Sequence, residues 1–210
     1  MTKPAAPLPP PTWRDRMSAQ VADVGFLRHL WHNFAPVAPG VYRSNHPGDR
    51  RLVAYAARHG IRAVVNLRGD AGGAPQRIEA AACARLGLAF ASVAMSARSA
   101  PRPEALLHLL DLFDTLPRPF LMHCKSGADR AGLASALYLL HREGASVATA
   151  RAHLSWRFLH VRGSRTGILD GFLDAYEAAL ADGPVPIRDW IAKGYDRSAL
   201  LAAHGRVAAT

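Results

Sequence analysis

A thiol and a guanidinium lie six residues apart in this chain, at Cys124 and Arg130. The apolar run 120–122 before them is typical of a strand, and the apolar stretch 131–140 after them predicts a helix. A loop between a strand and a helix N-terminus can point its backbone N–H groups inward and hold a dianion of phosphate size. The same positive field favours thiolate over thiol. The spacing therefore predicts a nucleophilic sulfur at the floor of an anion site.

The other residues of the loop fit such a site. Arg130 has a planar fork that can grip two phosphate oxygens and follow them into the transition state. Gly127 suits a tight bend, where a side chain would crowd the loop or disfavour a positive φ. Lys125 adds a second cation, which favours polyanionic substrates unless it is only a solvent-facing lysine. We expect the substrate phosphate to be bound by the loop residues Lys125, Ser126, Gly127 and Ala128.

The pattern His123-Cys124, five residues, Arg130, with Gly127 in the middle, resembles the signature of the cysteine-dependent phosphatases. Its Asp-Arg ending is similar to atypical bacterial and lipid-acting members, so the resemblance implies a bacterial protein tyrosine or dual-specificity phosphatase. It further implies that Cys124 attacks phosphorus in line, that Arg130 and the backbone amides hold the equatorial oxygens, and that water hydrolyses a phosphocysteine intermediate. No cofactor is implied.

The general acid is the unsettled role. Many relatives carry an aspartate about thirty residues before the cysteine, whereas residues 88–110 of this chain contain Glu104 as their one acid. We assign the role to Asp129, as in the relatives with the Asp-Arg ending, and keep Asp70 and Glu104 as alternatives. The other interpretation of Asp129 is a cap of the following helix. A carboxylate beside Arg130 has its pKa pulled down unless desolvation or bound phosphate raises it again.

The charge balance predicts the kind of partner. The chain has 26 Lys and Arg against 16 Asp and Glu, so we expect anionic partners: a phosphorylated protein, a phosphoinositide or a small phosphorylated metabolite. Nucleic acid is not expected, because the charges are scattered and few aromatic residues are available for stacking.

No stretch is apolar and long enough to span a membrane, while peripheral contact with an acidic membrane stays open. Two cysteines suit a reducing compartment, so a cytoplasmic location is expected. His29 and His32 have no third ligand nearby, so no metal site is predicted.

Apolar runs and helical periodicities alternate along the chain. With short connections, this alternation predicts an α/β domain with a mostly parallel central sheet flanked by helices on both faces, as in dual-specificity phosphatases. Ligands gather at the carboxyl ends of parallel strands, so we expect Arg43 and Arg68 to reach the substrate beside the Cys124 loop; the alternative for both is a solvated strand end. The expected strands are 41–44, 61–67, 88–95 and 120–122, and the expected helices are 50–59, 75–86, 103–116, 131–140, 146–158 and 168–180, followed by a last short helix.

We expect a flexible Pro-rich arm over residues 1–11 and one phosphatase domain over 12–205. The domain would comprise an N-terminal helix at 12–34, a catalytic core at 35–181 and a C-terminal extension at 182–205. Two other functional classes stay open. A pseudophosphatase would keep the anion site as a phospho-ligand binding module without turnover. An arsenate reductase or sulfurtransferase also uses a cysteine in such a loop, although arsenate reduction would need a resolving thiol, for which Cys83 is the one other cysteine.

Overall fold

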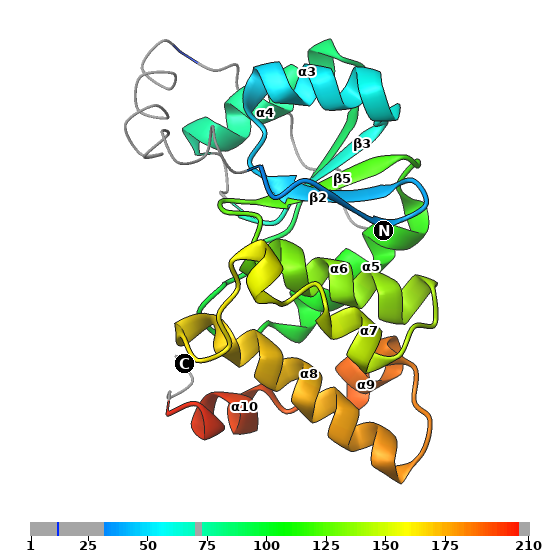
Figure 1. Cartoon of the computed structure of the whole chain (residues 1–210), viewed down its shortest axis with the longest axis vertical. Coiled ribbons are helices and arrows are strands. Elements are labelled where there is room, and N and C mark those ends of the chain that lie inside the picture. The colour runs from blue at the N-terminus through cyan, green and yellow to red at the C-terminus, as the bar shows by residue number, and fades with distance from the viewer. Residues whose placement is uncertain (1–11, 13–31, 70–72, 206–210) are drawn as a thin grey trace.

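The computed structural model describes residues 12, 32–69 and 73–205, which form a five-stranded sheet covered by helices on both faces (Figure 1). The sheet order is β1-β2-β5-β3-β4. Four strands run parallel to their neighbours, and β1 pairs antiparallel with β2. The predicted mostly parallel α/β fold is therefore confirmed. The strands are β1 (Ala35–Ala38), β2 (Val41–Asn45), β3 (Ala63–Asn66), β4 (Ala89–Ser92) and β5 (Phe120–Cys124).

Two apolar cores lie on the two faces of the sheet. Val64 and Leu121 point into the smaller core, under α3 and α4. Their neighbours Val65 and Met122 point into the larger core, under α5, α6 and the C-terminal helices. This alternation is that of central strands buried on both faces. The helices are α3 (Gly48–His59), α4 (Ala74–Arg85), α5 (Pro103–Thr115), α6 (Asp129–Arg142), α7 (Val147–Arg151), α8 (Ile168–Ala179), α9 (Ile187–Lys193) and α10 (Arg197–Ala203), with 3₁₀ turns η1 (Trp156–Phe158), η2 (Arg165–Gly167) and η3 (Leu180–Asp182).

Local sequence explains where the helices that flank the site begin and end. Gly60 ends α3 in the left-handed conformation, at φ 63°, which glycine adopts without strain. Pro75 and Pro103 lie in the first turns of α4 and α5, where a missing N–H costs nothing. Helix α6 is buried continuously from Ala131 to Leu139, so its uniformly apolar sequence matches an inner helix.

One strand was not expected from the sequence, and one expected helix is shorter than predicted. The two prolines and the glycine of residues 35–40 indicated a connection, but Ala35–Ala38 form β1 at the edge of the sheet, where a missing N–H is tolerated. The helix predicted over 146–158 ends at Arg151: Ser155 is extended, and Leu159 has a positive φ of 63°. The C-terminal segment forms α9 and α10 rather than a single helix.

Some expectations fall on residues that the structure does not describe. These are the arm at 1–11, nearly all of the helix predicted at 12–34, and Asp70. Within the described part of the chain, every helix is too short or too polar to cross a bilayer.

Candidate active site

Residues 124–130, the phosphate loop, connect the central strand β5 to the N-terminus of α6. Cys124 ends β5, between β2 and β3. Its Sγ accepts a hydrogen bond from the backbone N–H of Gly127 at 3.3 Å. Helix α6 starts at Asp129, so its positive dipole end faces the loop. The structure brings together the thiol, an inward-facing amide and a helix N-terminus, which are the parts of an anion site.

Gly127 allows the loop to pack directly against β2. Its φ is +73°, and a Cβ at this position would lie 2.6 Å from the backbone nitrogen of Asn45 and 2.7 Å from the carbonyl carbon of Ser44. Such distances are far below van der Waals contact, and both neighbours belong to a central strand that cannot give way. Both reasons given for glycine from the sequence, conformation and space, therefore hold.

Arg43 lies behind the phosphate loop. Its side chain is fully buried; one terminal nitrogen donates to the carbonyl oxygens of Gly127 and Ala128, and the other donates to the carbonyl of His153 at 2.7 Å. The guanidinium also lies 3.8 Å from the ring centroid of Phe158. Burial lowers the pKa of Arg43 to about 10, which keeps it cationic at neutral pH. The expectation that Arg43 reaches the substrate is corrected: it binds the back of the loop.

Three consecutive carbonyls on the back of the loop are thus held by side-chain donors. Arg43 binds those of Gly127 and Ala128, and the side-chain amide of Asn33 donates to that of Ser126 at 3.0 Å. When consecutive carbonyls are fixed on one side of a tight loop, the N–H groups are left for the other side. That other side is the one that holds the sulfur of Cys124.

A cavity of about 710 Å³ opens in front of the loop. Arg68 and Lys125 line it beside Arg130, so the predicted proximity of Arg68 to the loop is confirmed. The Nε atom of Arg130 is buried and has no hydrogen-bond partner among the described residues, so a phosphate oxygen can satisfy it. Two arginines between β4 and α5 also line the cavity, and neither was among the site residues expected from the sequence. The charged lining residues are Arg68, Arg98, Arg102, Lys125, Arg130 and Asp129.

Asp129 belongs to a chain of carboxylate, imidazole and carboxylate. Its Oδ1 lies 2.8 Å from Nδ1 of His160, and Nε2 of His160 lies 2.6 Å from Oδ2 of Asp170. Burial disfavours a charged imidazole, but hydrogen bonds and charge from the two aspartates outweigh it and raise the pKa of His160 to about 9. For the carboxyl of Asp129, desolvation raises the pKa, but hydrogen bonds from His160 and Thr166 outweigh it and lower the pKa below its usual value. The low pKa expected for Asp129 is found, and its main cause is His160.

Neither alternative acid is among the described residues that line the cavity. Glu104 is exposed in the first turn of α5 and does not line the cavity, and Asp70 lies outside the described residues. Asp129 is the one carboxylate among the lining residues that the structure describes.

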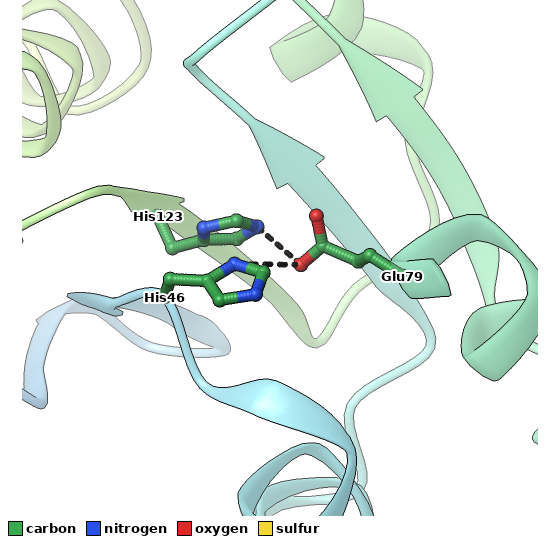
Figure 2. Close-up of side chains that lie close together, drawn as sticks. All are labelled: His46, Glu79 and His123. Atoms are coloured by element: carbon green, nitrogen blue, oxygen red, sulfur yellow. Dashed lines mark ion pairs between the residues drawn. The ribbon is translucent and has the colours of Figure 1, made fainter. Parts of the chain in front are cut away.

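A second cluster holds the residue that precedes Cys124 (Figure 2). Oε1 of Glu79, from α4, lies 2.6 Å from Nε2 of His123 and 3.7 Å from Nδ1 of His46. Its other oxygen accepts a hydrogen bond from Asn66 at 2.7 Å. Desolvation raises the pKa of Glu79, but His123, His46 and Asn66 more than offset it, so the pKa falls below its usual range. The cluster thus ties β5, just before the phosphate loop, to α4.

The same three side chains could offer ligands to a metal ion, because their donor atoms lie within 4.8 Å of one another. Two nitrogen or oxygen ligands about 2.1 Å from a tetrahedral metal are about 3.4 Å apart. The 2.6 Å between His123 and Glu79 is well below this, and it is the distance of a close ion pair. As arranged here, His123 and Glu79 are closer together than two ligands of one cation would be.

A central parallel strand that ends in cysteine, an anion-binding loop of five residues and an arginine in the first turn of the next helix define the cysteine-dependent phosphatases. The chain belongs to the DSP-PTPase phosphatase family of polymorphic toxin systems, whose family model matches residues 40–145. It is therefore a phosphatase of the protein tyrosine and dual-specificity class.

Solved structures share the fold at low sequence identity. The core catalytic domain of the PP-IP phosphatase SIW14 from S. cerevisiae has a TM-score of 0.55 at 18% identity, with 72% of this chain and 92% of that chain covered. P. aeruginosa TpbA has a TM-score of 0.55 at 24% identity, with 71% and 91% covered. A putative phosphatase from Shewanella putrefaciens has a TM-score of 0.58 at 16% identity, with 74% and 97% covered. Comparison with curated proteins gives no match.

Proposed function

We propose that the chain hydrolyses phosphoric monoesters with Cys124 as the nucleophile. The observation that carries this proposal is the inward-facing phosphate loop: the Gly127 amide bonds to Sγ, while Arg43 holds the carbonyls on the opposite side. The sulfur attacks phosphorus as the bond to the leaving oxygen breaks, and Arg130 and the loop amides stabilise the equatorial oxygens. Asp129 supplies the proton that the leaving oxygen takes up. Water then attacks the phosphocysteine, releasing phosphate and the thiolate.

For the substrate, we propose a phosphate ester that carries further anionic groups, such as a phosphoinositide or a small polyphosphorylated metabolite. Five cations and one carboxylate line the cavity, and no aromatic side chain stands among its described lining residues to stack on a phenyl ring. Among proteins of similar fold, SIW14 is named a PP-IP phosphatase, and TpbA has been solved in complex with pTyr. A phosphotyrosine protein is therefore the second candidate.

Arsenate reduction finds less support. Cys83 lies in the small core between the sheet and α4, on the face opposite α6, and it is fully buried. Burial raises its pKa to about 12, so it stays a protonated thiol at neutral pH. A resolving cysteine needs to be reachable and nucleophilic, and Cys83 is neither.

The test is phosphate release from 4-nitrophenyl phosphate, a phosphotyrosine peptide, a soluble phosphoinositide headgroup and an inositol polyphosphate. We expect turnover of all four, the highest kcat/KM for the polyanions, and a loss of about a thousandfold or more in Cys124→Ser. A wild-type chain that binds phosphate without turnover would instead be a binding module. A higher kcat/KM for the peptide than for the polyanions would refute the substrate proposal but leave the cysteine mechanism standing.

A further inference from the structure

His160 connects the active site to the interior of the C-terminal helices. The residue lies between η1 and η2, its side chain is buried, and both ring nitrogens are engaged: Nδ1 by Asp129 at 2.8 Å and Nε2 by Asp170 at 2.6 Å. Asp129 lines the cavity, whereas Asp170 on α8 is 2% exposed. The three side chains form a linear path from the cavity wall to a buried carboxylate.

This path bears on the acid step of the proposed reaction. The leaving oxygen needs a proton, but the hydrogen bonds that Asp129 receives lower the pKa of its carboxyl, so Asp129 is ionised at neutral pH. A proton is available one hydrogen bond further from the leaving oxygen, on the imidazole of His160, whose pKa is raised to about 9. The charge facing the imidazole comes from Asp129 on α6 and Asp170 on α8, and the hydroxyl of Thr166 in η2 lies 3.5 Å from Nδ1. The positive charge of Arg43 on β2 also interacts electrostatically with the carboxylate of Asp129.

We propose that His160, held by Asp170, stores the proton that Asp129 delivers to the leaving group. As the phosphorus–oxygen bond breaks, the proton on Nδ1 passes to the carboxyl of Asp129 and from there to the leaving oxygen. The imidazole becomes neutral and keeps its Nε2–H bond to Asp170. In the second step, water gives its hydroxyl to phosphorus and its other proton returns through Asp129 to Nδ1. His160 is thus a positioning residue that acts through Asp129, and the inference rests on the proposed function.

Burial of the path makes Asp129 the route for this proton. The imidazole of His160 is 1% exposed and the Asp170 side chain 3%, so bulk water does not reach the far end of the path. Asp170 has no contact with the cavity, and it can influence catalysis only through His160. A purely structural role for the same contacts would be to fasten residues 159–167 to α6 and α8.

Asp170→Asn separates these two roles, and Asp174→Asn is its matched control. Asp174 lies one turn along α8, is partly exposed and pairs with Arg151 and Arg162. The measurement is kcat/KM against pH with two esters, 4-nitrophenyl phosphate, whose leaving group needs little protonation, and phenyl phosphate, whose leaving group needs more. In Asp170→Asn we expect the basic limb to move down by about one pH unit, and phenyl phosphate to lose at least about tenfold more than the nitrophenyl ester. Asp174→Asn should match the wild type.

Equal losses for both esters with an unmoved basic limb would overturn the proposal in favour of a structural role. Histidine ¹⁵N NMR gives a readout that does not depend on activity, because the His160 resonance should titrate at a lower pH in Asp170→Asn than in the wild type. If Asp170→Asn does not fold, His160→Gln serves in its place, since it keeps a hydrogen-bond donor but cannot store a proton; phenyl phosphate should again lose at least about tenfold more than the nitrophenyl ester. An inactive wild type would refute the proposed function itself, whereas an active wild type with an Asp170→Asn variant that behaves like it would refute only the relay.

Discussion

Arg43 and Gly127 meet at the back of the phosphate loop, where a terminal nitrogen of the buried guanidinium donates to the carbonyl oxygen of the glycine. The same nitrogen donates to Ala128 at 3.1 Å. The loop is therefore shaped from behind by an arginine that does not face the cavity.

Arg43→Lys should disrupt this support while keeping the charge. A lysine ammonium lacks the fork that reaches carbonyls on both sides, so at least one buried carbonyl loses its partner. We expect the free energy of unfolding to fall by about 2–4 kcal/mol and kcat/KM to fall with it, measured by urea denaturation and phosphate release. The control is Arg85→Lys, whose partner Asp49 is exposed, with an expected cost below about 1 kcal/mol. Equal effects in the two variants would contradict the role of Arg43.

Gly127→Ala should inactivate the enzyme through lack of space. Gly127 and Gly144 both have positive φ, +73° and +60°, so alanine is strained at either position. At Gly127 the new Cβ meets the backbone of β2 at 2.6 Å, whereas at Gly144 nothing lies within 4 Å. We expect Gly144→Ala to cost about 1 kcal/mol of stability and to keep its activity. Gly127→Ala should lose activity by much more than its loss of stability explains. Retained turnover in Gly127→Ala would show that the loop can move away from β2.

The local part of the site could be read from the sequence, and the long-range part could not. Cys124, Gly127 and Arg130 lie within one strand-loop-helix unit, where spacing determines geometry. His160 binds Asp129, and Asp170 binds His160, but both lie beyond an irregular segment that was expected to be helical, so no periodicity indicates that the three side chains meet.

Arg43 shows the same limit in a strand. From the sequence, a charged residue in a short strand suggests a solvated strand end. The carbonyls that Arg43 binds belong to residues 84 and 85 positions later in the chain. The Glu79 cluster likewise joins three separate segments of the chain, and no sequence motif predicts that they meet.

His160 should make stability depend on pH above neutrality. Its pKa is about 9 in the folded chain, against an ordinary value of 6.5, so folding favours the protonated ring. The stabilisation is complete below pH 6.5 and is lost as pH rises through 9; a shift of this size corresponds to at most about 3 kcal/mol. Urea denaturation between pH 6 and 10 should show this decline in the wild type but not in His160→Gln. His108→Gln, an exposed substitution on α5, should keep the wild-type curve. A curve for His160→Gln parallel to the wild type would mean that the ring is not held as a cation.

Arg98 and Arg102 should set the preference for polyanions. Both line the cavity from the segment before α5, and both are exposed, so they can meet anionic groups of a substrate without being needed for the fold. Replacing each with glutamine should lower kcat/KM for an inositol polyphosphate by about three- to tenfold at low salt, and 4-nitrophenyl phosphate should be affected less because it presents a single phosphate to the loop. The difference should shrink as ionic strength rises, since exposed charges are screened.

Arg58→Gln on α3 makes the same change in net charge away from the cavity lining, so it separates the local field from the charge of the whole chain. If Arg58→Gln lowered polyanion turnover as much as Arg98→Gln and Arg102→Gln, the preference would come from overall charge and the cavity would have no part in choosing the substrate.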